Sequence, residues 1–329
     1  MNGFYSLSLS ARATLDLHSL NNEGGEGNQI QTRMVNIVGE DGRMYNVNAI
    51  SGDMWKHIQA EHLFRLAAEG DRVPLCEGCR RFDANRISAD TAFQAQLQNK
   101  ETKDADVLDS LLQTCALDDM EGNLLTMGNR SLPRKSVVEF GWVVGVPDSV
   151  ATDSYFHVKY ASERSAGQRA ADETEEARGA NLGQNIFHRP ASSGVYAIVA
   201  NLELARIGLN DITQVYAISQ EERVARQKIL LESLLYSFLQ PNGAMRNTQN
   251  PHLVAFAGVV AVSQCAVPAP TVSPLTVGYD VQIKEITQSL EPLHGGQIQL
   301  YPFGSLAEFA QVMAGLIESG EPYQLTFRG

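Results

Sequence analysis

The stretch FYSLSLSARATLDL (residues 4–17) alternates polar and apolar side chains over its whole length. One side of it carries Leu7, Leu9, Ala11, Ala13, Leu15 and Leu17. Because successive side chains of an extended chain point to opposite faces, this alternation predicts a half-buried β-strand. The segments that follow extend it into a strand–loop–hairpin–helix opening.

A polar, glycine-containing segment, LHSLNNEGGEGNQIQTRMV (residues 17–35), follows this strand and is predicted to be a flexible loop. Its glycines match neither the P-loop nor the GxGxxG pattern, which argues against a nucleoside-triphosphate site. Its amide and guanidinium groups could approach a sugar-phosphate backbone without reading bases, and they belong to Asn21, Asn22, Asn28, Gln29 and Arg33. The alternative is an ordinary polar surface loop, which composition alone favours.

RMVNIV and RMYNVNAI flank the turn GEDG (residues 39–42), a pattern typical of a β-hairpin. Residues 50–70 then predict a helix with Ser51 as its N-cap and an apolar stripe on one face. The free N–H groups at such a helix start bind anions, and Lys56 and His57 lie about one turn further on. An ordinary capped helix with two exposed polar residues is the competing and more common interpretation.

Residues 71–135 contain few long apolar periods and are interpreted as an inserted subdomain. Cys76 and Cys79 form a CxxC pair, and Cys115 and Asp118 follow with CxxD spacing. Two short-spaced pairs are the usual layout of a structural zinc site, although only three of these four side chains are thiols. The alternative is a reduced surface pair with an unrelated, buried Cys115.

KSVVEFGWVVGV (residues 135–146), DSYFHVKYA (153–161) and QNIFHRPASSGVYAIVANLEL (184–204) read as strands. The charged residues 162–183 between the last two contain almost no large apolar side chains, so the pattern predicts a long projecting hairpin.

Two more helices are predicted to begin after Ser219 and Ser305, each with a glutamate three residues later as in a capping box. HLVAFAGVVAV (residues 252–262) predicts a buried strand, and VGYDVQIKEIT (277–287) predicts another. Before them lies a second glycine-started polar loop, GAMRNTQNPH (243–252), in which Arg246 could reach a phosphate; a tight helix C-cap is the alternative. Strands and helices interleave without a βαβα rhythm, which favours an α+β sheet with helices on one face.

The formal charge of −12 and the pI near 5.1 weigh against a nonspecific nucleic-acid binder, but they allow a local basic groove on an acidic body. The longest apolar run, residues 253–262, is too short to span a bilayer, and no signal peptide is evident. Four cysteines in such a chain are typical of a cytoplasmic, reduced protein. The sequence contains neither HExxH nor GxSxG.

Three stretches, HSLNNEGGEGNQIQTR (residues 18–33), YNVNAISGDMWKH (45–57) and GAMRNTQNPH (243–252), resemble the DevR-type backbone subunit of type I CRISPR Cascade complexes. The resemblance covers nearly the whole chain and is densest over residues 10–65. It implies a modified RNA-recognition-motif (ferredoxin-like) palm formed by residues 1–70, 136–152 and 193–329. It also implies a helical finger at 71–135 and a thumb hairpin at 153–192.

The same resemblance implies a non-catalytic subunit whose copies stack head to tail along a CRISPR guide RNA (crRNA). The thumb wedges between nucleotides, and the guide then pairs with a target DNA strand. Other partners implied are the subunit capping the crRNA 5′ end, the large and small subunits and the helicase-nuclease. The resemblance implies no required cofactor, and the cysteine spacing leaves a structural zinc as an open alternative. By resemblance, the RNA-binding residues are Asn21, Asn22, Asn28, Arg33, Ser51, Lys56, His57 and Arg246.

Two enzymatic alternatives remain open. Related backbone subunits of type III complexes cut target RNA with a loop aspartate, and the local candidates here are Asp16, Glu23 and Glu26. A zinc-dependent enzyme built on the three cysteines of residues 76–115 would need an open coordination position and a nearby base.

Overall fold

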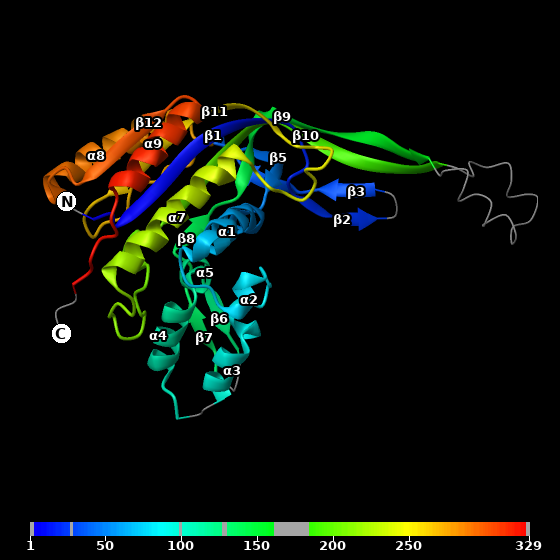
Figure 1. Cartoon of the computed structure of the whole chain (residues 1–329). Helices are drawn as coiled ribbons and strands as arrows, with labels where there is room; N and C mark the ends of the chain where they lie inside the picture. Colours follow the sequence, from blue (N-terminus) through cyan, green and yellow to red (C-terminus); the bar gives the residue numbers. More distant parts are fainter. Residues whose placement is uncertain (1–2, 27–28, 99–100, 127–129, 161–183, 327–329) are drawn as a thin grey trace, which may run out of the picture.

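The computed structural model describes residues 3–26, 29–98, 101–126, 130–160 and 184–326 (Figure 1). Its largest element is an antiparallel sheet with the strand order β12–β11–β1–β10–β9–β5–β4. These strands are β1 Ser6–His18, β4 Met34–Val38, β5 Met44–Ile50, β9 Val143–Tyr160, β10 Gln184–Leu202, β11 His252–Ser263 and β12 Ile298–Phe303. The short strand β8 (Val138–Phe140) pairs with β10 outside this order.

Strand β1 lies near the middle of the sheet, between β10 and β11, and it is more buried than its sequence predicts. Leu7, Leu9 and the other predicted apolar positions as far as Leu15 are buried. The serines on the opposite face are buried as well, because residues 267–270 cover them: the Ser8 hydroxyl donates to Pro270 O at 2.6 Å. Leu17, at the end of the alternation, is 48% exposed. The expected half-buried strand is therefore covered on both sides.

Three helices cover one face of the sheet: α1 (Gly52–Ala68), α7 (Gln220–Leu239) and α9 (Leu306–Ser319). Each begins at the predicted serine N-cap, since Ser51, Ser219 and Ser305 accept hydrogen bonds from the backbone N–H three residues later. The core beneath them includes Trp55, Phe238, Phe256 and Phe309. The predicted α+β class is confirmed, and the structure shows that the sheet is antiparallel.

The strand predicted for residues 277–287 is wrong, because this segment begins helix α8 (Tyr279–His294). Tyr279 and Ile283, one helical turn apart, pack against Val259 of β11. Val260, the next residue of that strand, belongs to the main core, so α8 covers the opposite face of the sheet from α9. The helices therefore do not all lie on one face.

The segment predicted as a loop after β1 forms a small hairpin of β2 (Asn22–Glu26) and β3 (Gln29–Thr32). The next hairpin, β4–β5, has the predicted turn, in which Gly39 N donates to Arg43 O at 2.9 Å. Figure 1 shows β2 and β3 lying beside the long ribbon formed by β9 and β10.

Residues 71–135 extend below the sheet in Figure 1 as a separate group of short elements. These are η1 Glu69–Asp71, α2 Glu77–Arg80, η2 Arg86–Ala89, α3 Thr91–Gln98, α4 Asp104–Thr114, α5 Ala116–Glu121, β6 Asn123–Leu125 and β7 Leu132–Arg134. The strand predicted for residues 135–146 is divided between β8 and the start of β9, and β9 continues through the strand predicted for residues 153–161 and pairs with β10 over most of its length. The predicted tip, residues 162–183, lies outside the described residues. A further turn, η4, spans Leu204–Arg206. No helix in the described ranges is both long and apolar enough to cross a bilayer.

Candidate nucleic-acid interface

A buried asparagine joins the segment after β1 to the start of α1. Oδ1 of Asn21 accepts a hydrogen bond from Ser51 N at 2.8 Å, and Asn21 is only 5% exposed. The Ser51 hydroxyl in turn accepts from Met54 N at 3.1 Å as the N-cap of α1. The backbone oxygen of Asn21 accepts from the Thr32 hydroxyl at 3.2 Å. Asn21 thus holds the base of the β2–β3 hairpin against the helix start.

The loop between α7 and β11 (residues 240–251) packs on the same segment. Ala244 N donates to Leu20 O at 3.0 Å. A Cβ atom at Gly243 would lie 2.7 Å from the Cα of Leu20 and 2.8 Å from its carbonyl oxygen, so this close approach requires glycine. The two polar loops singled out in the sequence are therefore neighbours in the fold.

The base of the β9–β10 ribbon completes this arrangement. Nε2 of Gln249 donates to Pro190 O at 2.7 Å, and the Arg189 guanidinium donates to the Thr248 hydroxyl at 3.3 Å. A parallel bridge between Gln29 and His188 attaches β3 to the same part of β10. We call the meeting point of residues 18–21, Ser51, residues 188–190 and residues 240–251 the polar junction.

The polar junction contains four buried polar atoms without a hydrogen-bond partner in the described part of the chain: Nε2 of His18, Nε of Arg189, Nδ2 of Asn242 and Oε1 of Gln249. Burial lowers the pKa of His18 to about 4, so the ring is neutral at pH 7. Its Nδ1 accepts from Leu20 N at 3.5 Å, which places the ring proton on Nε2. Three of the four atoms are therefore hydrogen-bond donors. Each buried group without a partner lowers the stability of the folded state by about 1–3 kcal/mol.

Lys56 does not point toward the polar junction. Its Nζ donates to Glu121 O at 2.9 Å and to the Ser136 hydroxyl at 2.8 Å, and it lies 3.9 Å from Oε2 of Glu121. Burial lowers the pKa of Lys56, and burial raises the pKa of Glu121. The ammonium group thus ties α1 to the end of α5 and to Ser136, between β7 (Leu132–Arg134) and β8.

His57 lies on the same side of α1 as Lys56, in a pocket of about 440 Å³ between α1 and the 71–135 insertion. Its ring centroid is 5.7 Å from that of Phe82, and Asp53 and Arg86 also line the pocket. The predicted helix-start motif is therefore divided, with Ser51 at the polar junction and the other two residues facing the insertion.

Three other predicted residues, Asn22, Arg33 and Arg246, lie nearer the polar junction. Asn22 accepts from the Ser19 hydroxyl at 2.7 Å, and the Arg246 guanidinium donates to Oδ1 of Asn242. The guanidinium of Arg33 lies over the half-exposed ring of Trp142, 5.4 Å from its centroid. Asn28 lies outside the described residues.

Sequence reasoning missed several residues that the structure brings to this region. Arg189 and Gln249 reach it through contacts between distant segments, and no local pattern marks them. On the adjoining ribbon, Phe156 is 69% exposed and its ring lies 4.5 Å from that of His188. An exposed aromatic residue within an alternating strand is the one signal that could have drawn attention to this pair.

The cysteine pattern has converged as its spacing predicts. One donor atom from each of Cys76, Cys79, Cys115 and Asp118 lies within 4.8 Å of the others, and all four residues are buried. We call these residues the cysteine cluster. Cys76 caps α2, whereas Cys115 joins α4 to α5, so the cluster closes the base of the insertion.

Asp16, the one acidic candidate for RNA cleavage whose side chain is described, belongs to no comparable grouping. Asp16 lies near the end of β1, opposite His252 of β11. Within the described ranges, the cysteine cluster is the only set of three or more His, Cys, Asp or Glu side chains with converging donors, and Asp16 is not part of it. The side chains of Glu23 and Glu26 lie outside the described set.

Comparison with known proteins gives the chain its family. The model of the family described as CRISPR-associated negative auto-regulator DevR/Csa2 matches residues 9–282. CRISPR-associated protein Cas7/Csa2 1 of Saccharolobus solfataricus (strain ATCC 35092 / DSM 1617 / JCM 11322 / P2) is 23% identical over 241 residues, which cover 71% of each protein.

Two solved structures are similar to the chain over most of its length. A chain of a CRISPR RNA-guided surveillance complex has 12% identity and a TM-score of 0.48, with 95% of this chain and 99% of that chain covered. The crystal structure of Thermofilum pendens Csc2 has 13% identity and a TM-score of 0.36, with coverages of 97% and 92%. Because the family model spans most of the sequence, this protein belongs to the CRISPR-associated DevR/Csa2 family.

Proposed function

We propose that this protein is a non-catalytic backbone subunit of a type I CRISPR Cascade complex. In this proposal its copies polymerise head to tail along a crRNA and present the guide for pairing with a target DNA strand. Membership of the DevR/Csa2 family supports the assignment to CRISPR defence. The observation that carries the RNA-binding role is the polar junction, where four separate segments meet and three buried donors lack partners.

The chemistry of the junction suits a sugar-phosphate backbone. His18 Nε2, Arg189 Nε and Asn242 Nδ2 are donors, and phosphate and ribose oxygens are acceptors. Arg246 adds a positive charge beside Asn242. A guide held through its backbone keeps its base edges free for pairing, as RNA-guided recognition requires.

The strand order supports an RNA-recognition-motif palm. Strand β1, helix α1, strands β9 and β10, helix α7 and strand β11 follow one another in the βαββαβ order of a ferredoxin-like fold. Their arrangement in the sheet, β11–β1–β10–β9, is antiparallel throughout. In this proposal residues 71–135 are the finger and residues 153–192 the thumb.

The palm would not bind bases as an ordinary RNA-recognition motif does. Such motifs stack bases on aromatic side chains across the open face of the sheet. Here residues 267–270 and helix α8 cover that face, and Ser8 and Ser10 of β1 are almost fully buried. RNA binding is therefore assigned to the polar junction and to the adjoining ribbon, where Phe156 and His188 offer a stacking surface.

The further partners in this proposal are the subunit that caps the crRNA 5′ end, the large and small subunits and the helicase-nuclease. Head-to-tail stacking uses two different surfaces of each copy, so it continues until the RNA or a capping subunit ends it. The assembly is assigned to the cytoplasm. In this proposal RNA binding requires no cofactor, and within the described residues Asp16 belongs to no group of three or more converging His, Cys, Asp or Glu side chains.

RNA binding by purified protein with two single-charge variants tests this function. We expect Arg246→Ala to weaken binding of a guide transcript and to reduce the slope of log K against log salt by about 0.7. Lys284→Ala is the matched control, because this exposed residue lies on α8 and its loss removes the same charge. Equal effects of both variants, or no RNA binding at low salt, would contradict the proposal.

A cleavage assay distinguishes the type III alternative. Complementary RNA incubated with the assembled protein–crRNA complex and Mg²⁺ is expected to remain intact. Periodic cuts that disappear in an Asp16→Asn variant would establish a nuclease in place of a passive backbone subunit.

A further inference from the structure

The cysteine cluster has the geometry of a metal site. Sγ of Cys79 lies 3.4 Å from Oδ2 of Asp118, and Sγ of Cys76 lies 3.6 Å from the same oxygen. Around tetrahedral zinc, with Zn–S bonds of about 2.3 Å and Zn–O bonds of about 2.0 Å, each sulfur–oxygen edge measures about 3.5 Å. The two observed distances bracket this edge, as expected for two ligands of one tetrahedral zinc ion.

The surroundings of the cluster orient its donors. Nδ2 of Asn123 donates to Oδ1 of Asp118 at 2.6 Å, which leaves Oδ2 directed at the cysteines. Cys79 N donates to Sγ of Cys76 at 3.3 Å. Such secondary hydrogen bonds fix metal ligands in place. The turn that carries Cys76 and Cys79 also requires glycine at position 78, because a Cβ atom there would lie 2.0 Å from Arg86 O.

The carboxylate of Asp118 is fully buried, yet within the described ranges no lysine or arginine lies within ion-pair distance of it. A buried carboxylate normally needs a paired cation. The neighbouring Asp119, by contrast, has two arginine partners. A metal ion would supply the missing positive charge at Asp118.

We propose that the cysteine cluster holds one structural Zn²⁺ ion, bound by three thiolates and one carboxylate oxygen. Thiolate ligands in a tetrahedral arrangement select zinc over magnesium or calcium. Because the protein supplies all four ligands, no coordination position remains for a substrate. This ligand count assigns the ion a structural role and argues against a zinc-dependent enzyme.

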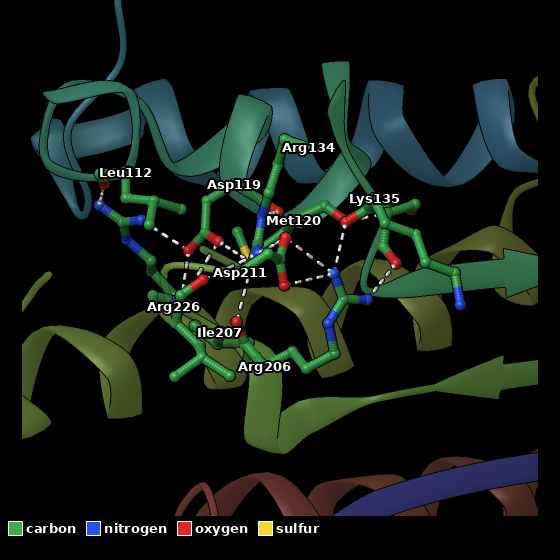
Figure 2. Close-up of polar contacts among 12 residues, drawn as sticks. Leu112, Asp119, Met120, Arg134, Lys135, Arg206, Ile207, Asp211 and Arg226 are labelled. Carbon is green, nitrogen blue, oxygen red and sulfur yellow. Dashed lines mark hydrogen bonds and ion pairs between the residues drawn. The ribbon is translucent and has the colours of Figure 1, made fainter. Parts of the chain in front are cut away.

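The ion would fix the base of the insertion to the rest of the protein through α5. Asp118 faces the cysteines, and the next residue, Asp119, accepts from Arg134 at 2.6 Å and from Arg226 of α7 at 2.7 Å. Figure 2 shows these arginine contacts from Asp119, together with the link to Arg206 through Asp211. One short helix therefore connects the metal site with the helix layer of the sheet.

Metal analysis of the full-length protein tests the site directly. We expect purified protein to contain about one zinc per chain. Cys115→Ser is expected to lose this zinc, whereas Cys265→Ser is the matched control, because Cys265 is the fourth cysteine and lies outside the cluster. Zinc-free protein from zinc-containing medium, or equal zinc in both variants, would overturn the proposal.

Two measurements cover the case in which Cys115→Ser does not fold. Cobalt added to wild-type protein that has been depleted of zinc is expected to give the intense visible bands and the thiolate charge-transfer band of a tetrahedral thiolate site. Asn123→Ala keeps all four ligands, and we expect its zinc affinity to fall 10- to 100-fold. Absence of the cobalt bands, or unchanged affinity in Asn123→Ala, would count against this ligand set. RNA binding is a separate measurement, so either proposal can fail alone.

Discussion

Asp119 and Asn21 are both buried polar residues that hold distant segments together, but their surroundings differ. The carboxylate of Asp119 accepts from Arg134, Arg226 and Gly208 N, so both of its oxygens are bonded. Asn21 lies at the polar junction, where four nearby side-chain atoms have no partner in the described part of the chain. The first network is closed at the Asp119 carboxylate, although Nε of Arg226 has no partner in the described part of the chain, whereas the second leaves three side-chain donors unpaired. In the proposed function, the first network stabilises the fold and the second binds RNA.

Breaking the closed network should have the largest effect. Asp119→Asn leaves the buried guanidinium groups of Arg134 and Arg226 without their shared charge, and we expect the free energy of unfolding to fall by about 3–5 kcal/mol. Denaturant unfolding measures this change. Asp71→Asn is the control, because Asp71 forms an exposed ion pair with Arg80 and should have no measurable effect. A small, equal change in both variants would show that the Asp119 network is not a main source of stability.

The open junction should make stability depend on pH. The folded pKa of His18 is lowered to about 4 by burial, whereas the unfolded value is about 6.5. Between pH 6.5 and pH 4, His18 is protonated in the unfolded chain but neutral in the folded one. The contribution of His18 to the free energy of unfolding is therefore complete above pH 6.5 and is lost as the pH falls toward 4. The full loss is about 3 kcal/mol.

Unfolding curves of the wild type and of His18→Gln across this pH range measure the contribution of His18. The variant should be less sensitive to acid between pH 6.5 and 4 than the wild type. His294→Gln, at the end of α8, should follow the wild type. Parallel curves for His18→Gln and the wild type would show that His18 is not the titrating group.

Gly243 tests how tightly the two loops of the junction must pack. Gly243→Ala would place a Cβ atom against the backbone of Leu20, and we expect a destabilisation of about 1–3 kcal/mol together with weaker RNA binding. Gly315→Ala is the control, since a Cβ atom there meets nothing within 4 Å and alanine suits the interior of α9. Thermal unfolding should move in opposite directions for the two variants. If Gly243→Ala changed neither stability nor RNA binding, the two loops would tolerate the added methyl group.

Local patterns predicted the fold where one physical signal dominated. The serine caps of α1, α7 and α9 and the turn of β4–β5 depend on neighbours in sequence, and the structure has them as expected. Helix α8 was misread because YDVQIKEI alternates like a strand. In the structure Tyr279 and Ile283, one helical turn apart, pack against Val259 of β11, a contact that no local pattern shows.

At the candidate site, too, sequence patterns predict local arrangements but not contacts between distant segments. The spacing within each pair of the cysteine cluster is local and indicated a candidate zinc site, whereas the meeting of the two pairs depends on the fold of the insertion. Lys56 looked like a phosphate ligand, but its bonds to Glu121 and Ser136 depend on how the insertion packs against α1. Arg189 and Gln249 could not be found from sequence, since they reach the junction only when β10 and the 240–251 loop come together.

The smallest expected effects distinguish a residue that shapes the junction from one that touches RNA. Asn21→Ala leaves Ser51 N without its partner, so we expect about 1–2 kcal/mol of destabilisation and weaker RNA binding together. Asn22 is half-buried, and within the described residues its side chain bonds only to the Ser19 hydroxyl, so Asn22→Ala should weaken RNA binding with little change in stability. Thermal unfolding and RNA titration of both variants separate these outcomes. If Asn22→Ala binds RNA like the wild type, Asn22 does not contact the guide, and direct contact is assigned to the other donors of the junction.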